Sequence, residues 1–377
     1  MWQPGLEHGR LSDDALAGAR LTGPTLREVL ALFLVAVALT VLVLTQFVAY
    51  EQKMLESGDK LEYGRISEAI REWSFEPPIA RKYFWGFPLA SAAAAAGLRI
   101  SDAYAMLVVS ALAALVAVVL VFRLWGGTVA ALFVVASPDW LQQTALGGAE
   151  PVFAFALFAG FLLARQDRWL WSAAVLSYAT LVRPVGVFAL LGLGVALLMS
   201  KRWMLCSAAT ALSLAIGVAY LAAVAAAYGD PAAHFAGYGP DWTEGRPVGL
   251  PFVALGKALL SSPPLLNVVK TSFWILASAA AMVVAFRRGL LASMFRAIPV
   301  EAVFACCYVA FLFTYDSAFA WSELPRFLLP VLPFVFAAFS SFVPRGRWFY
   351  WAMAVVSGVL AGASAVNVRH VVSKLWS

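Results

Sequence analysis

Residues 51–85 hold the largest cluster of ionisable side chains in this chain, and they lie between the first long apolar stretch and all the later ones. Carboxylates in such a cluster can move protons, and its cations can bind anions. The segment is therefore the first candidate for a surface site. Its acids are Glu51, Glu56, Asp59, Glu62, Glu68, Glu72 and Glu76, and its bases are Lys53, Lys60, Arg65, Arg71, Arg81 and Lys82.

Asp59 is the carboxylate of this segment that is best placed for acid–base chemistry. Gly58 breaks the preceding helix, so Asp59 falls at the N-cap or in the first turn of the next one. Glu62 lies one turn later and faces the same side of that helix. A partly desolvated carboxylate at a membrane surface can accept a proton from an incoming hydroxyl group. The structural alternative is that Asp59 only caps the helix and Glu62 pairs with Arg65.

Arg81 and Lys82 precede an aromatic cluster, residues 83–85, that leads into apolar sequence. Lys or Arg beside aromatic residues at a bilayer boundary usually serves as an interfacial anchor. The alternative is that these cations contact a lipid-linked phosphate at the depth of the headgroups.

Three further charged residues, Glu150, Arg183 and Arg326, lie at the ends of apolar stretches. Charges at such depth are costly and normally face a partner or a wet cavity. Glu150 and Arg183 could form a structural pair. Alternatively, the two arginines bind an anionic leaving group, because a guanidinium matches phosphate oxygens bidentately.

A second polar stretch, residues 229–267, contains Tyr238, Asp241 and Trp242. Aromatic rings that stack on sugar faces and carboxylates that bind hydroxyl groups would suit a carbohydrate, and the same residues suit an ordinary aromatic belt above a membrane. The chain has no histidine–carboxylate metal spacing, no phosphate-cradling glycine loop and no nucleophile elbow.

The composition excludes a soluble protein. The chain is 62% hydrophobic and only 13% charged, whereas soluble domains are about 25% charged. Apolar segments of about 18 or more residues are long enough to cross the bilayer as helices. In lipid, backbone N–H and C=O groups are satisfied only within helices or within a closed barrel. In a membrane protein, the excess of Lys and Arg behind the net charge of +6 usually reflects which loops face the cytoplasm. The sequence has no basic run with interleaved aromatic residues, which would have predicted a nucleic-acid partner.

We therefore predict an all-α polytopic bundle of about eleven crossings that forms one domain over residues 1–377. Its first external loop, residues 51–86, is expected to contain short amphipathic helices. Residues 86–98 are too short to cross and are predicted to be re-entrant or interfacial, broken by Pro88 and Gly97. The predicted spans are residues 29–50, 103–122, 128–138, 151–164, 169–181, 185–199, 204–228, 268–286, 298–319, 327–342 and 348–366.

The distribution of Lys and Arg predicts the orientation. One set of loops is short and basic, as a cytoplasmic face should be, and it includes the amino-terminal residues 1–27. The polar segments 51–86 and 229–267 then share the external side. Arg369 and Lys374 do not fit the external carboxyl terminus that this topology requires.

Five segments share their order and spacing with one known family: residues 58–63 (GDKLEY), 82–89 (KYFWGFPL), 149–153 (AEPVF), 180–184 (TLVRP) and 325–333 (PRFLLPVLP). Together they resemble the GT-C glycosyltransferases, polytopic enzymes that use polyprenyl-phosphate sugars, and most of all the protein O-mannosyltransferase and aminoarabinose-transferase branch. The resemblance extends over roughly residues 27–345.

This resemblance implies an inverting transfer of a hexose or pentose from a polyprenyl-phosphate donor to a lipid, glycan or protein hydroxyl outside a bacterial inner membrane. It implies Asp59 as general base and Lys82, Arg183 and Arg326 around the donor phosphate. The supporting or acceptor-binding residues would be Glu62, Tyr83, Glu150, Tyr238, Asp241 and Trp242. Whether the protein needs Mg²⁺ or Mn²⁺ as a cofactor stays open, because Lys60 follows Asp59 where the family often has a second acid.

Two other functions are compatible with such a chain. A transporter or lipid flippase usually has ionisable groups near mid-membrane and two repeated halves, and neither is evident here. A non-catalytic assembly subunit would tolerate the loss of the acidic pair.

Overall fold

The computed structural model describes residues 23–47, 59–75, 83–236, 253, 265–287, 290–314, 324–340, 342–344 and 346–375. Every regular element among these residues is a helix, so the predicted all-α class is confirmed. In chain order the helices are α2 (Leu26–Phe47), α4 (Asp59–Glu72), α5 (Gly86–Leu98), α6 (Asp102–Trp125), α7 (Gly127–Val135), α8 (Pro138–Ala145), α9 (Glu150–Arg165), α10 (Trp169–Val182), η1 (Pro184–Gly186), α11 (Val187–Met199), α12 (Trp203–Tyr228), α13 (Ala233–Ala236), α15 (Leu265–Arg287), α16 (Leu290–Ala297), α17 (Pro299–Thr314), α19 (Leu324–Leu328), η3 (Leu329–Val331), α20 (Leu332–Phe339) and α21 (Arg347–Leu375).

Helices α2, α6 and α12 are each long and apolar enough to cross a membrane. Helices α8 and α9 pass the same test as one span that is bent by 109°. Six shorter apolar helices also occur in the described part of the chain. The number of about eleven crossings therefore stays a prediction.

Two boundaries differ from those expected from the sequence. Helix α2 begins at Leu26, because Thr25 and Glu28 form a capping box: the Glu28 backbone N–H donates to Thr25 Oγ1 (3.3 Å) and the Thr25 N–H to Glu28 Oε2 (2.8 Å). The predicted break of residues 86–98 at Pro88 is wrong, since α5 is continuous. Pro88 lies in its first turn, where a proline costs no hydrogen bond, and Gly97 lies beside its end.

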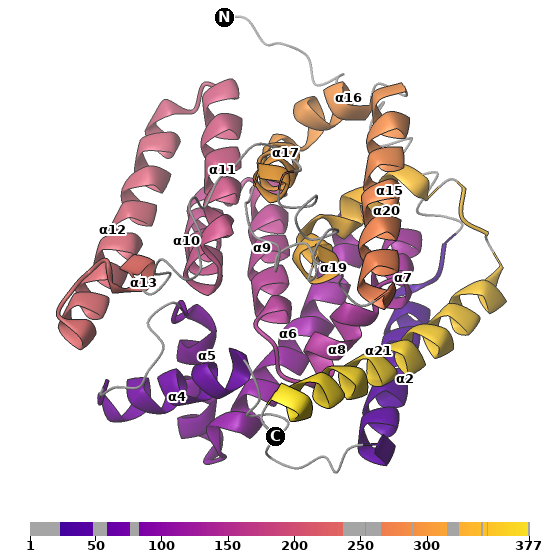
Figure 1. Cartoon of the computed structure of the whole chain (residues 1–377). Helices are drawn as coiled ribbons and strands as arrows, with labels where there is room; N and C mark the ends of the chain where they lie inside the picture. Colours follow the sequence, from indigo (N-terminus) through magenta and orange to yellow (C-terminus); the bar gives the residue numbers. More distant parts are fainter. Residues whose placement is uncertain are drawn as a thin grey trace, which may run out of the picture.

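Helix α21 packs along α2 (Figure 1). Small residues allow the close approach: a Cβ at Gly358 would lie 2.7 Å from the Ala36 carbonyl oxygen. The Thr40 hydroxyl, fully buried, donates to the Gly358 carbonyl at 3.2 Å. Along another edge, α12 packs mainly on α10 and α11, and few of its residues are buried (Figure 1).

Helix α4 is amphipathic, as predicted for the first external loop. It buries Tyr63, Ile66, Ser67 and Ala69, which recur at helical spacing on one face. Asp102 at the start of α6 fixes this helix in place: Ser67 Oγ donates to Asp102 Oδ1 (2.6 Å), and Arg71 contacts Asp102 Oδ2 (3.0 Å). The beginning of α4, where Asp59 lies, is thereby held against the bundle.

We expect Asp102→Ala to loosen α4. The substitution removes two hydrogen bonds to a charged group, together worth at least about 1.5 kcal/mol, so amides of residues 59–72 should exchange with deuterium at least about tenfold faster. Asp167→Ala is the matched control, because it breaks an ion pair with Arg202 that is more exposed and lies in the α9–α10 turn. Unchanged exchange in α4 after Asp102→Ala would show that these contacts do not anchor the helix.

Helix α9 is held by charges at both ends. At its carboxyl end, Arg165 bonds Glu301 of α17 (2.6 Å) and the Leu124 carbonyl of α6 (2.7 Å). The carboxylate of Glu301 is buried, so its pairing with Arg165 replaces its lost hydration. Glu150, at the other end of α9, lies about 22 Å away at the usual helical rise.

Candidate active site

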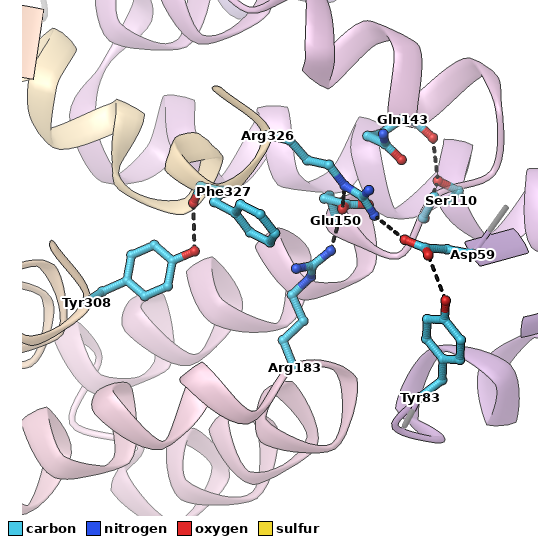
Figure 2. A network of polar contacts seen from close by, with 10 residues as sticks. Asp59, Tyr83, Ser110, Gln143, Glu150, Arg183, Tyr308, Arg326 and Phe327 are labelled. Carbon is cyan, nitrogen blue, oxygen red and sulfur yellow. Dashed lines mark hydrogen bonds and ion pairs between the residues drawn. The ribbon is translucent and has the colours of Figure 1, made fainter. Parts of the chain in front are cut away.

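Four charged side chains from four separate segments meet at the beginning of α9; we call Asp59, Glu150, Arg183 and Arg326 the ionic cluster (Figure 2). Arg326 bridges the two carboxylates: its Nη2 contacts Asp59 Oδ2 at 3.2 Å, and its Nε donates to Glu150 Oε1. Arg183 Nη2 donates to the same Glu150 oxygen. The cluster thus alternates two anions with two cations.

Glu150 is positioned by the turn between α8 and α9. Gly147 has φ +71°, which a residue with a side chain rarely adopts. A Cβ at Gly148 would collide with side-chain oxygens of Gln143 and Glu150. Ser110 of α6 ties the turn down by donating to the Gly148 carbonyl at 2.9 Å, and Pro151 is tolerated in the first turn of α9.

Arg183 is positioned by the proline that follows it. A residue before proline avoids the helical region, and Arg183 is extended, with φ −143° and ψ 127°. Helix α10 therefore ends at Val182 and turns the guanidinium towards Glu150. The guanidinium also lies 5.7 Å from the ring centroid of Phe327.

Arg326 lies on the five-residue helix α19, which passes into the 3₁₀ turn η3 at Leu329–Val331. Tyr308 of α17 supports this segment from below, since its hydroxyl donates to the Phe327 carbonyl at 2.6 Å (Figure 2). Tyr308 is only 2% exposed. The backbone that carries Arg326 is therefore fixed at the next residue by a buried hydrogen bond.

Asp59 is the most accessible member of the cluster, with 40% of its side chain exposed, against 4% for Glu150. Its Oδ1 accepts a hydrogen bond from the Tyr83 hydroxyl at 2.7 Å. Partial burial raises the pKa of Asp59, but the charge of Arg326, the hydrogen bonds from Tyr83 and Arg326 and the charge of Arg183 together lower it below its ordinary value. Asp59 is therefore a carboxylate at neutral pH.

Tyr83 belongs to a segment that is fixed by aromatic packing. The backbone N–H of Trp85 donates to the Tyr220 hydroxyl of α12 (3.2 Å), and that hydroxyl lies 2.7 Å from His234 Nε2. Phe84 stacks on His234 with ring centroids 4.9 Å apart. Residues 83–85 are thus joined to the beginning of the second polar stretch, residues 229–267.

A small cavity lies beside the ionic cluster, and it is lined by Glu150, Phe153, Arg183, Tyr308, Arg326, Phe327, Leu329 and Pro330. Two buried atoms of its lining residues, Glu150 Oε2 and Arg183 Nε, have no hydrogen-bond partner within the described part of the chain. Unmade hydrogen bonds of buried polar groups are costly. A polar ligand bound here can supply the missing partners.

The described residues do not fit a Mg²⁺ or Mn²⁺ site. Across the described ranges, no three His, Cys, Asp or Glu side chains converge as ligands would. Both carboxylates of the cluster already bind guanidinium groups. Lys60 lies next to Asp59, and burial together with the charge of Arg326 lowers its pKa to about 7 despite the opposing effect of Glu150 and Asp59.

The structure brings together five of the residues that the sequence selected: Asp59, Tyr83, Glu150, Arg183 and Arg326. Both interpretations of Glu150 and the arginines are compatible with this cluster. Glu62 contacts Arg65 at 3.0 Å, which is the structural alternative considered for it. Lys82, Tyr238, Asp241 and Trp242 lie outside the described residues.

Tyr308 and Gln143 were not selected from the sequence. Tyr308 lies within an apolar span, where nothing distinguishes a positioning hydroxyl from a packing ring. The sequence signal for the turn beside Gln143 is the glycine pair Gly147-Gly148, which is soon followed by Glu150 and Pro151.

No protein-family model matches this chain, and no curated protein matches its sequence. Among solved structures, its fold is similar to that of ArnT from Cupriavidus metallidurans, which was crystallised bound to undecaprenyl phosphate. The TM-score is 0.53 at 16% sequence identity, and the similarity covers 90% of this chain and 72% of that one. The chain thus shares the fold of that protein, and its helices α2, α6 and α12 are long and apolar enough to cross a membrane.

Proposed function

We propose that this chain is a membrane glycosyltransferase that moves a sugar from a polyprenyl-phosphate donor to an acceptor hydroxyl on the external face. The observation that carries the proposal is the ionic cluster: a partly exposed carboxylate, Asp59, lies beside two guanidinium groups on a GT-C fold. The solved structure of similar fold was bound to undecaprenyl phosphate, which supports a donor of this lipid class.

The proposed reaction is a single displacement. The acceptor oxygen attacks the anomeric carbon, a new C–O bond forms, and Asp59 takes the hydroxyl proton. The bond between the anomeric carbon and the phosphate oxygen breaks, and the electron pair leaves with the polyprenyl phosphate. Arg326 and Arg183, with Lys82, stabilise that charge, and the anomeric configuration inverts.

The environment of Asp59 suits a base. Its lowered pKa keeps it ionised at neutral pH, and its two oxygens retain lone pairs beyond the hydrogen bonds from Tyr83 and Arg326. Its exposure leaves room for an acceptor. Under this proposal the amino terminus is cytoplasmic, the membrane is the bacterial inner membrane, and Tyr238, Asp241 and Trp242 serve to bind the acceptor.

Reconstitution into liposomes tests the proposal against its rivals. Vesicles loaded with a pH-sensitive dye receive a radiolabelled polyprenyl-phosphate sugar and acceptors extracted from membranes. Label that moves from the donor to an acceptor without a proton flux supports the transferase. A donor-dependent proton flux without transfer would favour a transporter, and lipid binding without either would favour an assembly subunit.

Tyr308→Phe tests whether the buried hydroxyl positions Arg326 for this reaction. It leaves the Phe327 carbonyl without its partner, at a cost of about 1–3 kcal/mol, and frees the backbone next to Arg326. We expect kcat to fall about tenfold with little change in the KM for the donor, if Arg326 acts mainly on the leaving group.

Tyr350→Phe is the matched control for this substitution. Tyr350 is equally buried, at 3% exposed, and its hydroxyl bonds Thr128 away from the cluster. Both variants should lose a similar amount of thermal stability, and only Tyr308→Phe should lose turnover. Equal turnover in the two variants would show that Tyr308 has a packing role alone.

A further inference from the structure

We propose that this protein transfers sugar without a divalent metal ion, because Arg326 supplies the fixed positive charge that such an ion would supply between Asp59 and Glu150, and Lys60 takes the position next to Asp59 where a second acid would be a ligand. The inference rests on the proposed function and adds to it the cofactor requirement. It follows from coordination, from charge and from the position of Lys60.

A guanidinium group already fills the bridging position between the two carboxylates, and Glu150 Oε2, which has no hydrogen-bond partner among the described residues, offers a cation only one carboxylate oxygen. Arg326 reaches from Asp59 Oδ2 to Glu150 Oε1, so the guanidinium lies where a bridging ion would lie (Figure 2). The other Asp59 oxygen accepts from Tyr83 at 2.7 Å. Glu150 Oε1 also accepts from Arg183. An ion at the usual metal–oxygen distance of about 2.1 Å would have to displace Arg326 from both carboxylates.

The buried hydrogen bond from Tyr308 to the Phe327 carbonyl opposes that displacement. It fixes the backbone next to Arg326 at 2.6 Å from α17, and the 3₁₀ turn η3 follows within three residues. The guanidinium is therefore a pre-positioned part of the site. A pre-positioned cation stabilises developing charge without reorganising during the reaction.

The charge balance also opposes a divalent ion. Two carboxylates of the cluster face two arginines, and Lys60 adds a third basic group beside them. Burial and Arg326 together lower the pKa of Lys60 to about 7, as expected where positive potential is already high. A divalent ion needs an excess of negative ligands, and the described residues provide none.

The third carboxylate nearby is directed to another partner. Glu62 contacts Arg65 at 3.0 Å on the same helix. Hard cations such as Mg²⁺ and Mn²⁺ prefer carboxylate oxygens and bind few nitrogen ligands of proteins. Lys60, in the position next to Asp59, contributes an amine where a second acid would contribute a carboxylate ligand.

The test measures metal binding and transfer separately. Purified protein in detergent, with no substrate, is titrated with Mn²⁺ to about 1 mM, and free Mn²⁺ is read by electron paramagnetic resonance. We expect no stoichiometric binding by the wild type. In the transfer assay, EDTA followed by added Mg²⁺ or Mn²⁺ should change the rate less than twofold.

Lys60→Glu provides a gain-of-binding test. It places two adjacent acids at the start of α4 and replaces an amine with a carboxylate ligand, so Mn²⁺ should bind at least about tenfold more tightly than to the wild type. Arg65→Glu is the matched control, because it makes the same charge change on α4 and pairs with Glu62 rather than with the cluster. It should not gain Mn²⁺ binding.

One Mn²⁺ bound per wild-type chain, or transfer that EDTA abolishes and Mn²⁺ restores, would overturn the inference. Failure of a folded Lys60→Glu protein to gain Mn²⁺ binding would contradict the role of Lys60. The Mn²⁺ titration does not depend on enzymatic activity. Absence of transfer under every condition would therefore count against the proposed function, while the result on metal binding would remain valid.

Discussion

Asp59→Asn is expected to abolish sugar transfer while leaving the protein folded. The amide has the shape of the carboxylate and still accepts a hydrogen bond from Tyr83, but it cannot take a proton from the acceptor. General-base catalysis contributes about 10²–10⁴-fold, so kcat should fall by that factor or below detection. The KM for the donor should change little, because Arg326 and Arg183 remain.

Glu62→Gln is the control for this substitution. Glu62 lies one turn further along α4 and contacts Arg65, so the change removes a carboxylate of the same helix outside the ionic cluster. We expect transfer close to that of the wild type. Undiminished transfer by Asp59→Asn would eliminate Asp59 as the base, whatever Glu62→Gln does.

Arg326→Gln should have the second large effect, on stability and on rate together. It leaves Asp59 without its cation and Glu150 with Arg183 alone. Breaking one partner of a buried ion pair costs about 3–5 kcal/mol, which thermal unfolding in detergent can measure. Loss of a pre-positioned donor to the leaving phosphate should lower kcat about 10²–10³-fold.

The same variant should shift the pH dependence of transfer. In the wild type the pKa of Asp59 lies below its ordinary value, so the carboxylate persists as the pH falls through the usual range of aspartate, and activity is lost only below it. Without Arg326, partial burial raises the pKa with less to oppose it. The acidic limb of the profile should therefore move to higher pH in Arg326→Gln.

Arg202→Gln is the control for Arg326→Gln. Arg202 forms an ion pair with Asp167 in which both side chains are well exposed, at 42% and 66%, and such pairs contribute about 0–1 kcal/mol. Equal stability of the two variants would contradict a buried, structural part for Arg326. An acidic limb that does not move would contradict its control of Asp59.

Local rules allowed parts of the site to be predicted from the sequence. A proline after Arg183 and glycines before Glu150 end and begin helices at those residues, and Gly58 predicts that a helix begins at Asp59. Such rules place each charge at a helix end. They depend only on neighbours in the chain, so a single sequence contains them.

The partners of these charges could not be predicted in the same way. Arg326 and Asp59 are 267 residues apart, and only the packing of α4, α9 and α19 in three dimensions brings them together. The sequence left open whether Glu150 pairs with Arg183 alone, whereas the structure adds Arg326. Tyr308 was missed because a buried tyrosine in an apolar helix has no periodic pattern of its own.

The fold itself was predictable to the level of class and of most helices. Hydrophobic runs predicted α6, α10 and α12 within a few residues. The short polar helix α8 was missed, because its eight residues lack an apolar run, and the continuity of α5 was missed, because Pro88 was taken as a break rather than as a first-turn residue.

Release of free polyprenyl phosphate from a panel of polyprenyl-phosphate sugars tests the account most directly. Purified wild-type protein and Asp59→Asn are compared in detergent, with a membrane extract that supplies acceptors. The account predicts release from at least one donor by the wild type, with transfer of its sugar, and none above background by Asp59→Asn. Release that is equal in both proteins, or absent for every donor with the extract present, would contradict a glycosyltransferase that uses Asp59 as its base.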